Sequence, residues 1–170
     1  PRHFLCKALQ KGVYSSLSQL TVFLDDGGGM NDNELRGPQW QQLVGEFMPT
    51  RLGGRKREWS RANREAFEEV FIQYQPRWQQ EPLSRFWHDY LFDWLRVMCE
   101  QVGVDVPGRE EAVSIAREAG AYITRRVDSA FPGVVEAIRV LHDRGLVLHT
   151  ASGEHSDDLT GYLEAMGIRD

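Results

Sequence analysis

Two short apolar runs stand out from a chain whose other hydrophobic residues recur mostly at helical spacing. The run TVFLD predicts a strand at 21–25, and LVLHTA predicts a strand at 146–151. The second run is almost continuously apolar, which is typical of a strand covered on both faces. The long region between them, residues 33–130, shows no clear strand signal. The pattern therefore predicts two strands separated by a large helical region.

Apolar residues at three- and four-residue steps predict several helices within this region. One is expected from Pro38 to Met48 with the proline in its first turn, and another from about Glu110 to Tyr122. Ser60 is the expected N-cap of a helix whose apolar face comprises Ala66, Phe67, Val70, Phe71 and Tyr74. The strongest stripe comprises Leu83, Phe86, Trp87, Tyr90, Leu91, Trp94, Leu95 and Met98. Packing between helices accounts best for this stripe, with a ligand-binding aromatic box as the alternative.

Turn signals divide the rest of the chain. The basic run RLGGRKR at 51–57 indicates a solvated loop, or alternatively a mobile arm that meets an anionic substrate. A helix is expected at 132–144, between the Pro132 start signal and the Gly145 stop signal. Another is expected at 156–166, with acidic residues at the positive end of its dipole. The strand at 146–151 lies between these two helices.

Composition narrows the expected partners. The chain has 170 residues, a net charge of −5 and a pI near 5.6, so it lacks the basic character of an electrostatic nucleic-acid binder. No apolar run has the length of a membrane span, and no signal-type segment opens the chain. Cys6 and Cys99 lack metal-like spacing, which favours a reduced, cytoplasmic setting, with a single disulfide between them as the alternative. We expect a small-molecule substrate, no nucleic acid and no membrane; the oligomeric state stays open.

Candidate chemistry gathers where the two predicted strands end. Asp25 and Asp26 precede three glycines after the first strand, and Ser152 and Gly153 follow the second. If the strands are parallel neighbours, these groups meet at one edge of the sheet. A carboxylate there can attack an electrophile or hold Mg²⁺, and glycine N–H groups can bind anionic oxygens. The structural alternative is a tight acidic turn.

The residues at both strand ends match a known pattern. VFLDDGGGMND resembles the first motif of the haloacid dehalogenase-like (HAD-like) hydrolase superfamily, and PGVVEAIRVLHDRGLVLHTASG is similar to the segment leading into its second motif. The resemblance covers about 22–167 and implies an α/β fold. Residues 21–32 and 131–170 would form part of a Rossmann-like parallel-sheet core, and 33–130 a helical bundle cap. Residues 1–20 would be an N-terminal extension.

The resemblance also assigns roles residue by residue. It implies that Asp25 is the nucleophile and a ligand of Mg²⁺, and that Ser152, Gly153 and Gly28 bind the substrate's anionic group. Asp32 falls on the later aspartate of the motif. A register with Asp26 as the second aspartate would place Leu24 at the nucleophile position, so the register starting at Asp25 is preferred.

This chain departs from the family pattern at two glycines. Gly27 stands where the general acid and base is usual, and Gly29 where a threonine is usual. Asp26 is a poorly aimed substitute, because adjacent strand residues face opposite sides. The third and fourth motifs, a Lys or Arg and a pair of acids, cannot be assigned before Asp170. We therefore expect the chain to be part of a longer hydrolase.

The expected function is that of a HAD-like hydrolase acting on a small phosphorylated or halogenated organic substrate, with the phosphatase type first. Gly27 keeps two alternatives open: a metal-independent dehalogenase and a non-catalytic binding or regulatory module. A receiver domain of two-component signalling is disfavoured. It would need a third strand with a phospho-accepting Asp within roughly thirty residues, in regular alternation with helices.

Overall fold

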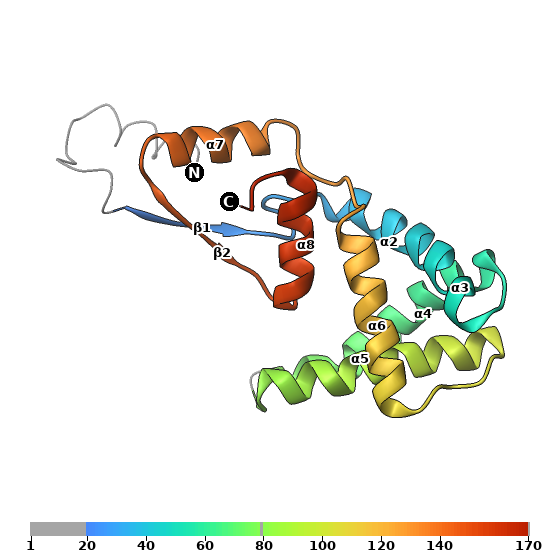
Figure 1. Cartoon of the computed structure of the whole chain (residues 1–170). Helices are drawn as coiled ribbons and strands as arrows, with labels where there is room; N and C mark the ends of the chain where they lie inside the picture. The colour runs from blue at the N-terminus through green and yellow to red at the C-terminus, as the bar shows by residue number, and fades with distance from the viewer. Residues whose placement is uncertain (1–19, 79, 170) are drawn as a thin grey trace.

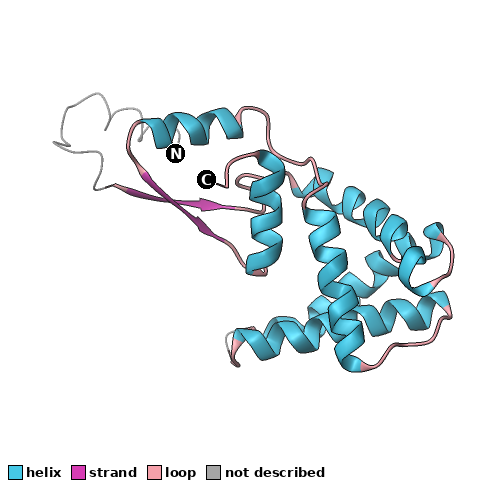
Figure 2. Cartoon of the chain, viewed as in Figure 1, coloured by secondary structure: helices cyan, strands magenta, loops and turns pink. Residues whose placement is uncertain are grey.

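The computed structural model describes residues 20–78 and 80–169, and within them the chain is mostly helical with one small parallel sheet (Figure 2). The predicted N-terminal extension and Cys6 lie outside the described residues, apart from Leu20. The elements are β1 (Thr21–Asp25), α2 (Asn33–Phe47), α3 (Pro49–Leu52), α4 (Lys56–Tyr74), the 3₁₀ helix η2 (Gln75–Arg77), α5 (Leu83–Val102), α6 (Arg109–Thr124), α7 (Val134–Asp143), β2 (Val147–Ala151) and α8 (Ser156–Met166).

The two predicted strands are confirmed, and they pair with each other in parallel. Their register places Asp25 beside Ala151, so both strands end at the same edge. The expectation that the second strand is covered on both faces is wrong, because its residues alternate between exposed and half-buried and Val147 is 44% exposed. Helix α7 packs against β2, and the exposed residues Val147, His149 and Ala151 share one face of the strand. The Rossmann-like arrangement of the core remains a prediction.

The helices between the strands form a bundle with a continuous apolar core (Figure 1). Helix α4 packs against α2 and α5, and α6 packs against α5 and α2. The largest fully buried apolar side chains of the bundle are Trp59, Met48, Leu95, Met98, Ile123, Val44 and Val70. None of the helices in the described residues has both the length and the apolar character that a membrane span requires.

Two helices begin earlier than their sequence signals indicate. Helix α2 begins at Asn33, because the Asp32 carboxylate accepts a hydrogen bond from the Glu34 N–H at 2.8 Å and caps it. Pro38 therefore lies inside this helix. Helix α4 begins at Lys56, ahead of Ser60, so the predicted N-cap is wrong. Instead, the Glu58 carboxylate accepts a hydrogen bond from the Arg55 N–H at 3.0 Å, so this backbone donor at the start of the helix has a partner.

The basic run at 51–57 is mostly helical. It contributes the end of α3 and the start of α4, and Gly53, Gly54 and Arg55 alone form the connection. Both glycines have positive φ, 74° and 77°, a conformation that glycine adopts readily. The prediction of one continuous loop is therefore wrong at both ends of the run.

The aromatic stripe on α5 is largely buried, as the interpretation of helix packing predicts. Phe86, Trp94, Leu95 and Met98 are buried, and Trp87, Tyr90 and Leu91 are half-buried against the same core. The expected apolar face of α4 is only partly buried. Phe67 and Phe71 are exposed and stack on each other, with ring centroids 5.6 Å apart.

Helix α8 links the strand region to the bundle through a close approach to α6. A Cβ atom at Gly161 would lie 1.9 Å from the Thr124 hydroxyl oxygen, so glycine is required for this packing. The predicted bounds of this helix, 156–166, agree with the structure. Its first turn follows directly on the loop after β2, and the contact with α6 therefore holds that loop against the bundle.

Candidate active site

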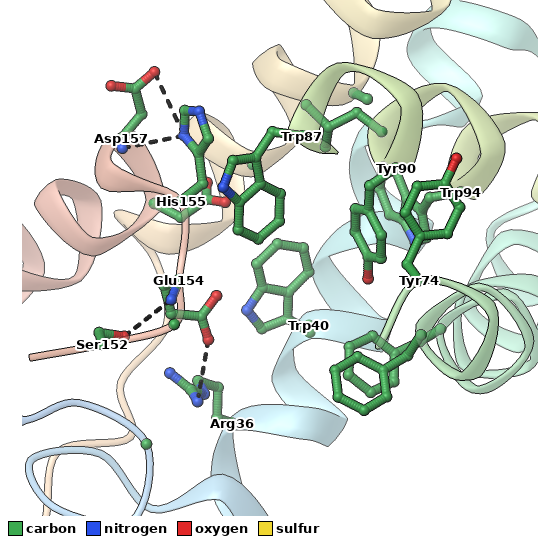
Figure 3. A pocket seen from close by; sticks show the side chains of 18 of the residues that line it. Arg36, Trp40, Tyr74, Trp87, Tyr90, Trp94, Ser152, Glu154, His155 and Asp157 are labelled. Carbon is green, nitrogen blue, oxygen red and sulfur yellow. Dashed lines mark hydrogen bonds and ion pairs between the residues drawn. The ribbon is translucent and has the colours of Figure 1, made fainter. Parts of the chain in front are cut away.

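A large cavity lies where the strand ends meet the bundle. Its volume is about 1680 Å³. Asp25, Ser152 and Gly153 line it from the strand ends, and residues of α2, α4, α5, α6 and α8 complete its wall (Figure 3). The predicted convergence of Asp25 and Ser152 on one pocket is thus found in the structure.

The adjacent carboxylates of Asp25 and Asp26 have different surroundings. Asp25 is exposed at the end of β1 and lines the cavity. Asp26 is 0% exposed; its carboxylate accepts hydrogen bonds from Asn31 Nδ2 at 2.7 Å and from the Arg36 guanidinium at 2.6 Å. Successive residues at a strand end face opposite sides, which separates the two groups. Asp26 therefore holds the turn, and Asp25 faces the space where a ligand would bind.

The glycines after these carboxylates have separate roles. A Cβ atom at Gly29 would lie 2.3 Å from the Asp25 carbonyl oxygen, so a threonine of the usual motif does not fit this turn. Gly28 has φ of 83° and is not among the residues that line the cavity, whereas Gly27 is. A Cβ atom at Gly27 would lie 2.9 Å from an Arg36 nitrogen. The Arg36 side chain thus takes up space in front of the position where the family pattern has its second aspartate.

The strand-end hydroxyl of Ser152 is held by its own loop. Its Oγ accepts a hydrogen bond from the Glu154 N–H at 3.1 Å, which leaves the hydroxyl hydrogen to be donated elsewhere. Gly153 faces the Trp78 ring, to which a Cβ atom would approach within 3.5 Å. Asp32, the third carboxylate of the first motif, does not line the cavity and caps α2.

The site also contains three charged residues, which the sequence patterns did not indicate as functional: Arg36, Glu154 and Asp158. Arg36 lies 2.6 Å from Asp26 and 3.5 Å from Glu154. Burial lowers the pKa of Arg36, but Tyr162 and the two carboxylates outweigh this and raise it overall. Burial also raises the pKa of Glu154; Arg36 opposes this rise, and Asp26 adds to it. Glu154 can therefore hold a proton at a higher pH than an ordinary glutamate.

Asp158 is the most perturbed carboxylate of the cavity. Burial, followed by repulsion from Glu154 and Asp157, raises its pKa to about 7. In the sequence it was interpreted only as an acidic residue in the first turn of a helix. The only sequence signal for a further role was its short distance along the chain from Ser152, and the contact with α6 that buries it is tertiary.

Aromatic side chains form much of the opposite wall. Trp40 comes from α2, and Trp87 and Tyr90 come from α5; Figure 3 shows them projecting toward the loop that carries Glu154 and His155. The rings of Trp87 and His155 meet edge to face, with centroids 5.4 Å apart. Trp87 and Tyr90 of the stripe therefore pack on the core and also border the cavity, and the ligand-binding alternative stays a prediction.

The described residues do not by themselves fit a divalent metal. They contain no group of three or more His, Cys, Asp or Glu side chains placed to hold one. Asp25 offers one carboxylate of the hard type that Mg²⁺ prefers. The Mg²⁺ site therefore stays a prediction of the resemblance.

Comparison with known proteins does not add a family. No protein-family model matches the chain, and a search of curated proteins finds no significant match. The resemblance to HAD-like hydrolases thus rests on the two motifs and on the arrangement of their residues.

Proposed function

We propose that the chain is a HAD-like hydrolase in which Asp25 is the nucleophile toward a small phosphorylated or halogenated organic substrate. The observation that carries this proposal is the meeting of Asp25 and Ser152, from the ends of adjacent parallel strands, in one large cavity. Residues 21–32 and 131–170 would belong to a Rossmann-like core. Residues 33–130 would form a helical cap, whose aromatic side chains enclose the substrate.

The proposed reaction begins with attack by an Asp25 carboxylate oxygen. On a phosphate ester, the new bond forms to phosphorus while the bond to the alcohol oxygen breaks, and the alcohol leaves. Water then attacks the phosphorus of the aspartyl phosphate and releases inorganic phosphate and the carboxylate. The Ser152 hydroxyl would donate its hydrogen to an anionic oxygen of the substrate.

The alcohol that leaves must receive a proton, and Gly27 cannot supply it. We assign this role to Glu154, which lines the same cavity two residues after Ser152 and whose pKa burial raises. The protonated acid would donate to the leaving oxygen, and the resulting carboxylate would then take a proton from the attacking water. On a halogenated substrate the leaving halide needs no proton, and Asp25 would attack carbon instead.

A turnover assay tests the nucleophile and separates the two chemistries. Phosphate release from p-nitrophenyl phosphate with Mg²⁺ and chloride release from 2-chloropropanoate would be measured for wild type, Asp25→Asn and Asp143→Asn. Asp143 is an exposed carboxylate on α7, so its variant changes the net charge alone. We expect Asp25→Asn to lower turnover by about a thousandfold or more, with Asp143→Asn unchanged. Wild-type turnover in Asp25→Asn would contradict the assignment of the nucleophile.

The non-catalytic binding module remains the second candidate, because Gly27 replaces the usual acid and Arg36 takes up the space in front of it. The same assay decides between the two. Release of neither product by the wild-type chain, with the fold intact by circular dichroism, would favour the binding module. If the chain is a binding module, Glu154→Gln has no activity to change. If the chain is the proposed enzyme, Glu154→Gln should lower phosphate release by about a hundredfold or more.

A further inference from the structure

Asp158 is packed into the cavity wall without a positive partner. It lies in the first turn of α8, and its Oδ1 lies 2.6 Å from the position of a Cβ atom on Gly120 of α6. Only a residue without a side chain leaves this space for the carboxylate. Within residues 20–78 and 80–169, no hydrogen bond or ion pair reaches its side chain, and the charges that act on it are the negative ones of Glu154 and Asp157.

The cations that line the cavity are engaged or peripheral. Arg36 donates to Asp26 and to Asn33, each at 2.6 Å, and contacts Glu154 at 3.5 Å. Arg64 and Arg117 are exposed, and Arg125 is exposed and paired with Glu164. The half-buried carboxylate of Asp158 thus carries a cost of desolvation and repulsion that a positively charged ligand would offset.

The surrounding aromatic rings suit such a ligand. Tyr90 lines the same cavity as Glu154 and Asp158, and burial, followed by the negative charges of these two carboxylates, raises the pKa of its hydroxyl. Trp87 meets Tyr90 edge to face at 5.6 Å between centroids. The Trp40 indole N–H is donated to the Tyr162 hydroxyl at 2.5 Å, so Trp40 can offer a ligand its ring atoms. Aromatic faces attract organic cations through the ring quadrupole.

We propose that an alkylammonium group of the substrate binds in the cavity to Asp158, Trp40, Trp87 and Tyr90. This proposal rests on the function proposed above. The substrate would then carry two ends: an electrophilic group that reacts at Asp25, and an ammonium group held on the helical side of the cavity. The cavity of about 1680 Å³ has room for such an extended small molecule. The aromatic wall and the unpaired carboxylate together favour a cation over a neutral aromatic ligand, which would leave Asp158 uncompensated.

The test uses choline and its neutral isostere, 3,3-dimethylbutan-1-ol, which have the same shape and differ in charge. Their affinities would be measured by tryptophan fluorescence and calorimetry with the whole chain, without any turnover. We expect choline to bind about tenfold or more tightly than the isostere. Equal affinities, or no binding of choline, would overturn the proposal.

Matched variants locate the charge that choline recognises. Asp158→Asn keeps the shape of the side chain and should weaken choline binding by about tenfold while leaving the isostere unaffected. Asp143→Asn changes the net charge equally on an exposed part of α7 and should have no effect. Gly120→Ala displaces the Asp158 carboxylate without removing it, and should weaken choline binding as well. Equal behaviour of Asp158→Asn and Asp143→Asn would overturn the proposal.

The two proposals fail in different ways. Choline contains no phosphoryl or halogen group, so its affinity does not depend on the chemistry of Asp25. A chain that hydrolyses the simple substrates above but binds choline no better than the isostere would contradict the ammonium subsite alone. Specific choline binding with undiminished turnover in Asp25→Asn would contradict the nucleophile alone.

Discussion

The helical bundle and the strand region are built in contrasting ways. In the bundle, α2, α4, α5 and α6 surround a continuous apolar core, and its central side chains are fully buried. In the strand region, β1 and β2 each alternate between exposed and half-buried residues, and Phe23 is 67% exposed. Yet the predicted nucleophile, Asp25, and the predicted anion-binding hydroxyl, Ser152, both come from the strand region. The contrast indicates that the bundle supplies most of the apolar stabilisation, while the strand ends supply the polar groups of the site.

The same substitution in each region would break or sharpen this contrast. Phe86→Ala removes a ring that is 3% exposed and should lower the free energy of unfolding by about 3–5 kcal/mol. Phe23→Ala removes a ring that is 67% exposed and should cost less than about 1 kcal/mol. Urea unfolding followed by circular dichroism measures both. Equal losses would show that the sheet is as important to stability as the bundle.

One polar network is an exception to the weak packing of the strand region. Asp26→Ala leaves the partly buried Arg36 without its nearest carboxylate and removes a hydrogen bond from Asn31, so it should cost about 3 kcal/mol. The neighbouring Asp25→Ala should leave the free energy of unfolding unchanged, since Asp25 is exposed. Denaturant midpoints of the two variants provide the measurement. A larger loss from Asp25→Ala would reverse the roles assigned to the pair.

Local sequence signals predicted which helices and strands exist better than they predicted the residues at which these elements begin and end. The strand Thr21–Asp25 and the helix Ser156–Met166 have the predicted bounds, because each lies between clear turn signals. Helix α4 begins earlier than predicted, because its start depends on a reciprocal contact of Arg55 and Glu58 rather than on a serine cap. The periodicity of α4 placed Phe67 on the same face as buried residues. It carried no information about what covers that face.

For the candidate site, the sequence indicated the groups at the strand ends and missed those brought in by packing. Asp25 and Ser152 could be predicted to converge, since parallel strands end at one edge of a sheet. Arg36 joins them through its ion pair with Asp26, and Asp158 through the close approach of α8 to α6 at Gly120. These contacts are tertiary and leave no periodic or motif signal in the sequence.

The dependence of stability on pH distinguishes the contribution of the Asp158 carboxylate from that of the apolar bundle core. The pKa of Asp158 is about 7 in the folded chain, above the ordinary aspartate value of 3.8. Between these two pH values the folded state holds a proton that the unfolded state has lost, so this group lowers stability as pH rises toward 7. Asp158→Asn removes this effect. The variant should therefore gain stability relative to wild type as pH rises, by on the order of 2 kcal/mol at pH 8 compared with pH 4.

Urea unfolding of wild type and Asp158→Asn across this pH range measures the difference, in which the titration of the other groups largely cancels. Phe86→Ala is the matched bundle variant, and its loss of stability should not depend on pH. A constant difference between wild type and Asp158→Asn from pH 4 to pH 8 would contradict the perturbed carboxylate and would weaken the case for an ammonium subsite beside it.

The smallest expected effect concerns a hydrogen bond that joins the two regions. Trp40 of α2 donates its indole N–H to the hydroxyl of Tyr162 on α8 at 2.5 Å. The Arg36 guanidinium lies 5.1 Å from the centre of the Tyr162 ring. Tyr162→Phe keeps the ring and removes the acceptor, so it should cost about 1 kcal/mol. Tyr122→Phe on α6 is the matched control, because no hydrogen bond to its hydroxyl is found among the described residues, and it should lower the free energy of unfolding only a little.

Urea midpoints compare the two variants. Equal losses of stability would mean that the Trp40 contact adds nothing to the attachment of α8. A loss confined to Tyr162→Phe would show that this bond helps to hold the loop after β2, with Ser152 and Glu154, against the bundle.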